Sequence, residues 1–146
     1  MMKVSVKKMR PGAKLPVYGS AMAAGADLCA CLDAPTVIPA GQTIMIPTGI
    51  AMEIPAGYAG LVYARSGLAA KRDLAPANKV GVIDADYRGE LKVSLVNLSN
   101  EEFEIVPGER IAQMVVAAHE QVKWEDVEVL SETVRGAGGW GSTGTK

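Results

Sequence analysis

The chain has 146 residues, a formal net charge of −1 and a charged fraction of 21%. That length fits a single domain that can bury a core without disulfides or a structural metal. The near-neutral charge excludes the overall basic field of a nucleic-acid-binding protein and the acidic block of a disordered tail, so local arginines must meet any anionic ligand.

Residues that bind zinc or direct a chain to a membrane are few. Cys29 and Cys31 lie two apart on a predicted strand, where both would face the same side, and without a second Cys or His cluster no zinc site is expected. His119 is the only histidine, and we expect it at a surface or interface. The N-terminal residues lack a signal-peptide core and no run of about 18 apolar residues occurs, so we expect a soluble cytoplasmic protein with no membrane partner.

Short apolar runs between turn residues dominate the sequence. Sixteen glycines and eight prolines separate them, and this pattern predicts an all-β sandwich or barrel. One helical turn is predicted at 66–72, with Ser66 able to cap it. The predicted strands, in chain order, span residues 3–7, 27–31, 43–46, 50–54, 58–64, 78–83, 91–97, 102–105, 111–117 and 127–130.

The stretch 81–90, GVIDADYRGE, places two acids between predicted strands. One strand-like run ends at Ile83 and the next begins after Gly89, so Asp84 and Asp86 are predicted near a hairpin bend. A carboxylate fixed there by two strands suits a general base. Asp is also common in turns because its side chain bonds to nearby backbone, so these residues alone leave a structural role open.

The C-terminal residues differ in kind from the rest. Half of the stretch 135–144 is glycine, which cannot pack a core. Arg135 can pair with phosphate oxygens, free backbone amides can wrap them, and Trp140 can stack on a base. A solvated tail would also explain the glycines, but not the arginine and the tryptophan. We therefore predict a β domain at 1–134 and a flexible glycine-rich arm at 135–146.

Five segments stand out along the chain: AGADL at 24–28, ARSGL at 64–68, GVIDADYRGE at 81–90, PGERIAQ at 107–113 and RGAGGWGSTG at 135–144. In order and spacing they resemble the five motifs of the trimeric deoxyuridine triphosphatases (dUTP diphosphatases). The resemblance covers nearly the whole chain, and the third and fifth motifs are almost unbroken.

The resemblance implies an all-β, jelly-roll-like β-clip subunit with one short helix, three of which form a homotrimer. It implies active sites built from more than one chain, with the C-terminal arm closing over bound nucleotide. The implied reaction is hydrolysis of dUTP to dUMP and pyrophosphate with Mg²⁺. This reaction keeps uracil out of DNA and supplies dUMP for thymidylate synthesis. No nucleic-acid partner is expected.

The resemblance also implies roles for single residues. Asp84 matches the general base that activates a water to attack the α-phosphorus. Asp27 matches the acid that holds waters of the Mg²⁺ bound to the triphosphate, a metal that keeps its waters and needs few protein ligands. Arg65, Ser66 and Gly67 match the motif that receives phosphate oxygens at the start of the short helix.

The remaining matches concern the base, the sugar and the outer phosphates. Asn78 and the following backbone resemble the uracil-reading segment, which a cytosine would leave unpaired, and Tyr87 matches the ring that excludes a ribose 2′-hydroxyl. Arg135, Ser142 and Thr143 would meet the γ-phosphate, and Trp140 would stack on uracil. The other substrate-binding residues so implied are Gly81, Val82, Ile83, Lys92, Gln113, Gly139 and Gly141. Glu109 and Arg110 more often serve contacts between or within subunits.

Two departures from the family pattern are Ala64, where many members have proline, and Trp140, where many have phenylalanine. Neither removes a catalytic group, and we expect arm affinity to change more than chemistry. A dCTP deaminase shares the fold, but its relatives typically lack the run Asp84-Ala85-Asp86-Tyr87. A regulatory protein that binds dUTP without hydrolysing it is the alternative from another class, and the intact Asp27, Asp84 and Arg135 argue against it.

Overall fold

The structure is a computed structural model that describes residues 2–139. Within that part of the chain it contains twelve strands and one helix, which confirms an all-β subunit with one short helix. Their bounds are β1 (Ser5–Lys8), β2 (Val17–Tyr18), β3 (Ala26–Cys29), β4 (Thr36–Ile38), β5 (Thr43–Pro47), β6 (Ile50–Glu53), β7 (Tyr58–Tyr63), α1 (Ser66–Arg72), β8 (Leu74–Pro76), β9 (Gly81–Ile83), β10 (Lys92–Asn97), β11 (Phe103–Ile105) and β12 (Arg110–Ala118). No described helix has the length and apolar character that crossing a membrane requires.

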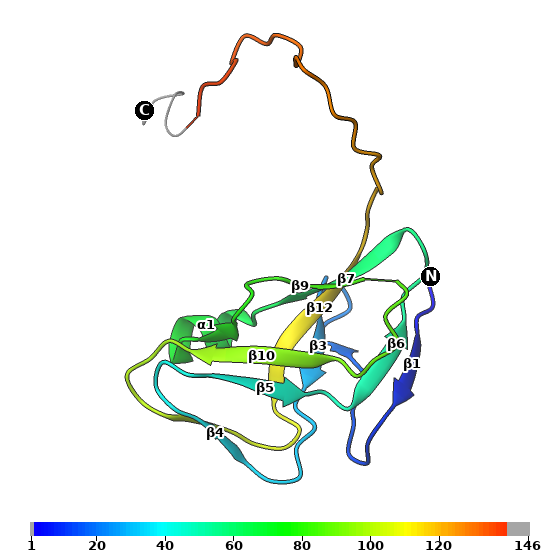
Figure 1. The fold of residues 1–146 in the computed structure, drawn as a ribbon. Helices are drawn as coiled ribbons and strands as arrows, with labels where there is room; N and C mark the ends of the chain where they lie inside the picture. Colours follow the sequence, from blue (N-terminus) through cyan, green and yellow to red (C-terminus); the bar gives the residue numbers. More distant parts are fainter. Residues whose placement is uncertain (1, 140–146) are drawn as a thin grey trace.

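The strands pair in four antiparallel sheets (Figure 1). The largest has the order β2-β3-β12-β7-β9, the next β5-β10-β8, and β1-β6 and β11-β4 are two-stranded. β12 is the longest strand, and it pairs with β3 on one side and β7 on the other. This places the ends of three strands from distant parts of the sequence side by side.

Apolar side chains from all four sheets meet in one core. Six of the largest are at most 1% exposed: Leu28, Ile38, Ile46, Leu95, Ile105 and Ile111. The polar Asn97 is also fully buried, but its amide donates to Ile38 O at 3.0 Å and Glu101 O at 2.7 Å. Burial of this amide is tolerated because its hydrogen-bonding groups are satisfied.

The predicted hairpin around Asp84 is wrong. β9 pairs with β7, whereas β10 pairs with β5 and β8, so the two flanking strands belong to different sheets. The segment between Ile83 and Lys92 therefore crosses from one sheet to the other (Figure 1). Strand pattern alone could not reveal this, because pairing depends on residues far away in the chain.

The predicted strand 78–83 is shorter than expected. Only Gly81–Ile83 is a strand, and Asn78 to Val80 form a turn. Lys79 has a φ of 66°, in the left-handed region, and its N–H donates to Pro76 O at 3.0 Å. This turn follows β8 directly and redirects the chain into β9.

The predicted cap of α1 is also wrong. Arg65 occupies the N-cap position in extended conformation and no side chain caps the helix, while Ser66 is already its first residue. The carbonyl of Arg65 accepts the N–H groups of Leu68 at 3.1 Å and Ala69 at 3.0 Å. The side chain of Arg65 extends away to Asp27 instead.

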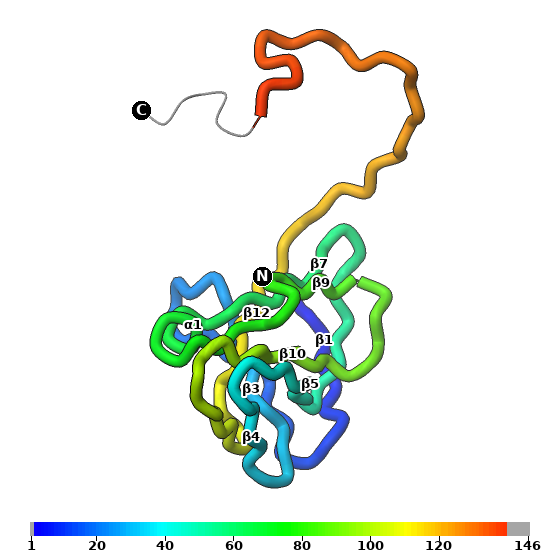
Figure 2. Tube along the Cα trace, turned by 60° about the vertical axis from the view of Figure 1, so that its left-hand side comes forward, coloured from blue at the N-terminus to red at the C-terminus, as the bar shows by residue number. Residues whose placement is uncertain are grey.

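One further predicted strand ends early and another is absent. β3 stops at Cys29, and Cys31 lies beyond it, donating its N–H to Pro47 O at 2.8 Å. The predicted strand 127–130 is absent, and Val129 and Leu130 are 82% and 81% exposed. Residues 119–139 instead lead away from the sheets in both views (Figures 1 and 2). A strand-like pattern cannot become a strand without a neighbouring edge to pair with.

Candidate active site

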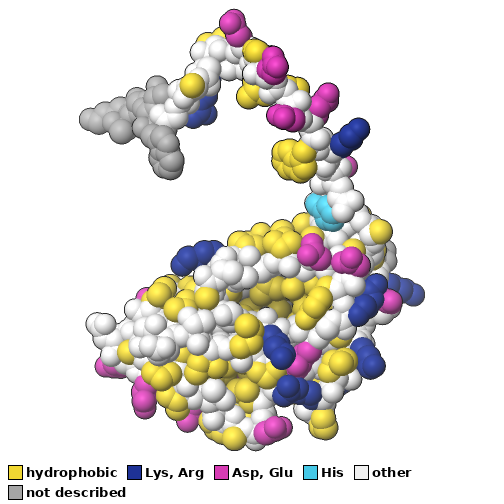
Figure 3. Space-filling model, viewed as in Figure 1, with side chains coloured by type: hydrophobic (Ala, Val, Ile, Leu, Met, Phe, Trp, Pro, Cys, Tyr) yellow, Lys and Arg dark blue, Asp and Glu magenta, His cyan; other side chains and the backbone are white. Residues whose placement is uncertain are grey.

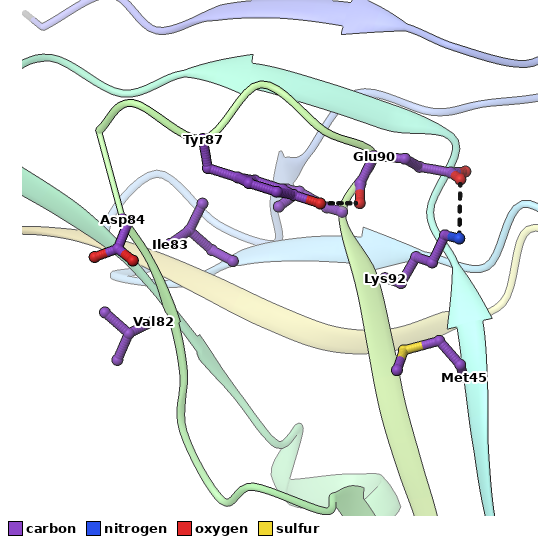
Figure 4. A pocket seen from close by; sticks show the side chains of 8 residues that line it. Met45, Val82, Ile83, Asp84, Tyr87, Glu90 and Lys92 are labelled. Carbon is purple, nitrogen blue, oxygen red and sulfur yellow. Dashed lines mark hydrogen bonds and ion pairs between the residues drawn. The ribbon is translucent and has the colours of Figure 1, made fainter.

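The segment that crosses between the two sheets forms one wall of a hollow of about 430 Å³ (Figure 4). β9 contributes Val82 and Ile83, with Asp84 directly after them. The facing wall comes from the end of the crossing segment and from β5 and β10. The lining residues are Met45, Val82, Ile83, Asp84, Tyr87, Glu90, Leu91 and Lys92.

Asp84 is exposed and is positioned from two directions. The residue before it, Ile83, pairs with Gly60 of β7. On its other side, Arg88 Nη1 donates to Ala85 O at 2.6 Å and to Tyr87 O at 3.1 Å, which holds the following turn. A carboxylate carried on such a braced segment can accept a proton from a water in the hollow.

The ring of Tyr87 reaches from the side of Asp84 and Ile83 toward Glu90 (Figure 4). Its hydroxyl donates to Glu90 O at 3.1 Å, and the residue is 45% exposed. A flat ring presented at the wall of a pocket is suited to packing against a sugar.

Glu90 connects the hollow to the N-terminal segment. Its Oε1 accepts the N–H of Gly49 at 3.1 Å and lies 3.0 Å from Arg10 Nε. Lys92 Nζ lies 3.9 Å from the other carboxylate oxygen. The side chain of Glu90 is only 14% exposed, whereas those of Arg10 and Lys92 are 43% and 48% exposed.

A second polar group gathers where β3, β7 and β12 meet. Arg65 Nε donates to Asp27 Oδ1 at 2.8 Å, and Arg110 Nη1 donates to Oδ2 at 3.1 Å. Both arginines line a hollow of about 420 Å³ together with Gly67 and Lys71. Guanidinium groups held in place by a carboxylate present their remaining N–H groups to an anion.

Gln113 lies beside this group. Its Nε2 donates to Ala64 O at 2.9 Å, so it contacts the residue just before Arg65. A Cβ on Gly25 would lie 2.5 Å from Gln113 Oε1, which means that the glycine leaves room for this amide. Among the predicted residues, Asp27, Arg65, Gly67 and Gln113 are thus brought together, with Ser66 exposed next to them.

Asn78 and Gly81 lie next to each other at the start of β9. A Cβ on Gly81 would be 3.4 Å from Asn78 Nδ2 and 3.3 Å from Val62 Cβ. The missing side chain leaves the backbone of Gly81 accessible beside a side-chain amide, as close approach of a planar ligand requires.

The C-terminal residues that can be described are not part of either hollow. Arg135 Nε donates to Gly138 O at 2.8 Å, a contact within the arm itself, and Gly139 is exposed. The predictions for Trp140, Gly141, Ser142 and Thr143 fall outside the described residues.

Asp27 can serve a metal through water. Each carboxylate oxygen can accept more than one hydrogen bond, so the two arginine contacts do not exhaust the acceptor capacity of Asp27. Within residues 2–139 no group of three or more His, Cys, Asp or Glu could hold an ion. This donor set fits a cation such as Mg²⁺ that is bound mainly by a ligand's phosphates and keeps its waters.

Two features were not anticipated from the sequence. The hollow beside Asp84 and the hollow beside Arg65 share no lining residue. Met45, Glu90 and Leu91 line the first hollow although no role was predicted for them. Glu90 follows Gly89 in the third motif, and this was the available signal, whereas nothing near Met45 in the sequence pointed to the site.

Comparison with known protein families gives a match that covers most of the chain. The family model for dUTPase matches residues 12–144. The deoxyuridine 5'-triphosphate nucleotidohydrolase of Rickettsia felis is 48% identical over 142 residues, which span 97% of this chain and 96% of the relative. The enzyme of the same name from Rickettsia bellii is 50% identical over 131 residues, with 90% and 87% covered.

Solved structures agree with this match. A mutant dUTPase of Staphylococcus bacteriophage 80alpha, determined with dUpNHpp, superposes with a TM-score of 0.89 at 27% identity and covers 99% of both chains. A mutant dUTPase from phage phi11 of S. aureus, described with a structural Mg(II) ion, has a TM-score of 0.81 at 23% identity, over 90% of this chain and 100% of the other. The jelly-roll-like fold expected from the five motifs is thereby confirmed.

Proposed function

The chain belongs to the dUTPase family and hydrolyses dUTP to dUMP and pyrophosphate, and we propose that Asp84 is the general base of this reaction. The observation that carries the proposal is the exposed Asp84 carboxylate at the edge of a hollow. Contacts on both sides of Asp84 hold the segment that carries it. The carboxylate accepts a proton from a water as that water attacks the α-phosphorus. Positioning of the water, together with stabilisation of charge on the phosphate oxygens, lowers most of the barrier.

Arg65, Ser66 and Gly67 receive the phosphate oxygens in this proposal, with Gln113 next to them. The support is the cluster in which Asp27 fixes Arg65 while the guanidinium keeps further donors free. Mg²⁺ would supply charge neutralisation on the triphosphate when bound. Asp27 would hold it through water.

The hollow lined by Val82, Asp84 and Tyr87 is called the Asp84 hollow, and its walls would select the base and the sugar. We assign uracil to the backbone of Gly81, Val82 and Ile83 and to the amide of Asn78, since an amide beside open backbone can match an alternating donor and acceptor edge. Tyr87 packs against deoxyribose, and Lys92 lies on the facing strand. Ribose would bring its 2′-hydroxyl against the Tyr87 ring.

A homotrimer with shared active sites explains two otherwise separate observations. The general base and the phosphate-binding group line different hollows of one chain, so a neighbouring chain can bring them together at one substrate. Residues 119–139 extend from the body with Trp124 89% exposed and Val134 fully exposed, and apolar, acidic and basic side chains follow one another along them (Figure 3). In the proposed trimer residues 135–146 close over a neighbour's site, where Arg135 and Gly139 to Thr143 meet the nucleotide.

Two experiments test these proposals. Pyrophosphate release from each deoxynucleoside triphosphate with Mg²⁺ should be confined to dUTP, and equal release from dCTP would contradict the uracil assignment. Mixing the inactive variants Asp84→Asn and Arg65→Ala, after unfolding and joint refolding, should restore activity because some mixed sites contain both intact groups. Activity that stays absent, with trimers of mixed composition present, would contradict shared sites.

A further inference from the structure

We propose that Gly89 and Glu90 are positioning residues that fix the ring of Tyr87, and that this fixed ring sets the preference for deoxyribose over ribose. The proposal rests on the role assigned above to Tyr87 as the wall against the sugar. It adds to that role the residues that determine where the ring lies.

Gly89 provides the space in which the ring lies. A Cβ at this position would clash with the Tyr87 hydroxyl oxygen, and it would lie 2.6 Å from Cζ and 2.9 Å from Cε2. Non-bonded carbon atoms do not approach so closely. Any side chain at 89 would therefore displace the ring from its present position.

Glu90 provides the hydrogen-bond acceptor that defines the ring's orientation. The Tyr87 hydroxyl donates to the backbone carbonyl of Glu90 at 3.1 Å (Figure 4). The ring is thus held at its outer end by a residue three positions later in the chain. The position of that carbonyl determines the position of the ring.

The carboxylate of Glu90 in turn fixes its own backbone. It accepts the N–H of Gly49 at 3.1 Å from the neighbouring turn and pairs with Arg10 at 3.0 Å from the N-terminal segment. Both partners come from outside the crossing segment, and the Glu90 side chain is 14% exposed. The Gly49 N–H contact is part-buried and charge-assisted, so it holds its groups more firmly than an exposed pair would.

These contacts place the ring without any contribution from a ligand. The segment from Asp84 to Glu90 lies between strands of different sheets, so strand pairing does not determine its conformation. A sugar wall can exclude one hydroxyl only if it does not yield when ribose enters. Anchoring by Gly89 and Glu90 supplies that resistance.

The test compares kcat/KM for dUTP with kcat/KM for UTP in five variants: Gly89→Ala, Glu90→Ala, Glu90→Gln, Arg10→Ala and Tyr87→Ala. Glu104→Gln is the matched control, because Glu104 is an exposed glutamate on β11 and lines neither hollow. Circular dichroism and the thermal midpoint establish that each variant folds. The ratio of the two kcat/KM values is the diagnostic quantity, since a purely structural defect lowers both alike.

We expect Gly89→Ala and Glu90→Ala to lower the dUTP:UTP ratio by about tenfold to a hundredfold, since small displacements of positioning groups have effects of this size. Glu90→Gln keeps an acceptor for the Gly49 N–H but loses the charge that pairs with Arg10, so its ratio should match that of Arg10→Ala and lie between wild type and Glu90→Ala. The control should keep the wild-type ratio.

An unchanged ratio in folded Gly89→Ala and Glu90→Gln, with a reduced ratio in Tyr87→Ala, would overturn the positioning role alone. An unchanged ratio in Tyr87→Ala would show instead that Tyr87 is not the sugar wall, which contradicts the proposed function of that residue. If Glu90→Ala does not fold, Gly89→Ala and Glu90→Gln still decide the question.

Discussion

Arg65 donates from Nε to Asp27 Oδ1 at 2.8 Å, and this contact joins the start of α1 to β3. The side chains are 24% and 14% exposed, and Arg110 occupies the second carboxylate oxygen at 3.1 Å. One carboxylate therefore orients two arginines beside the proposed phosphate site.

Asp27→Ala should weaken both folding and phosphate binding, because it removes the carboxylate that orients two guanidinium groups and leaves Arg65 with only its weaker contact to Arg110 O at 3.3 Å. We expect the free energy of unfolding to fall by about 1.5–3 kcal/mol. The KM for dUTP and the Mg²⁺ concentration for half-maximal rate should both rise. Urea unfolding and Mg²⁺ titration of the rate measure these effects, and an unchanged Mg²⁺ requirement would contradict the water-mediated role of Asp27.

Gly25→Ala should reduce activity with little loss of stability. The new Cβ would meet Gln113 Oε1 at 2.5 Å, and the end of a glutamine side chain can move away at low cost. Its amide would then leave Ala64 O, next to the phosphate site. Gly19→Ala is the control, since a Cβ there meets nothing within 4 Å. Equal kcat/KM in the two variants, measured with dUTP, would argue against a role for Gln113.

Asn97→Ala should destabilise the fold without changing substrate preference. The buried amide donates to Ile38 O and Glu101 O, and its loss leaves both carbonyls without this partner. We expect a decrease of about 2–4 kcal/mol in the free energy of unfolding. Comparing the urea unfolding of this variant with that of Asn100→Ala, at an exposed position, separates the effect of burial from that of residue type. Equal urea midpoints would contradict a stabilising role for the buried Asn97 amide.

The stability of the protein should fall at alkaline pH through Cys29. Burial raises the pKa of its thiol above the ordinary value of 9.0, and the nearby Asp27 adds to the increase while Lys14 opposes it. A pKa that is higher in the folded state contributes stability below pH 9.0, and this stability is lost as the pH rises through the folded-state pKa. Thermal midpoints measured from pH 7 upward should therefore fall more steeply for wild type than for Cys29→Ala, and parallel curves would contradict the assignment.

The sequence predicted most strands because short apolar runs end at glycine and proline. It also pointed to residues that line two hollows, since the motif around Asp84 and the motif around Arg65 are each local in sequence. What it missed depends on distant contacts. Arg10 and Glu90 meet although 80 positions separate them, and β9 and β10 join different sheets. The strand predicted at 127–130 is absent. Its pattern of apolar and polar residues would allow strand pairing, but a strand also needs a neighbouring strand, which a local pattern cannot reveal.

The proposed reaction depends most on Asp84 as the base. In Asp84→Asn the amide keeps the size of the side chain but cannot accept the proton from the attacking water. We expect binding of the non-hydrolysable analogue dUpNHpp to stay close to wild type, while kcat falls by about 10²–10⁴-fold. Asp86→Asn is the matched control, because Asp86 is also exposed and lies two residues away. Asp86 borders a second hollow with Asp84, next to His119, but does not line the hollow that contains Tyr87. Wild-type turnover in Asp84→Asn, or an equal loss in Asp86→Asn, would contradict the assignment.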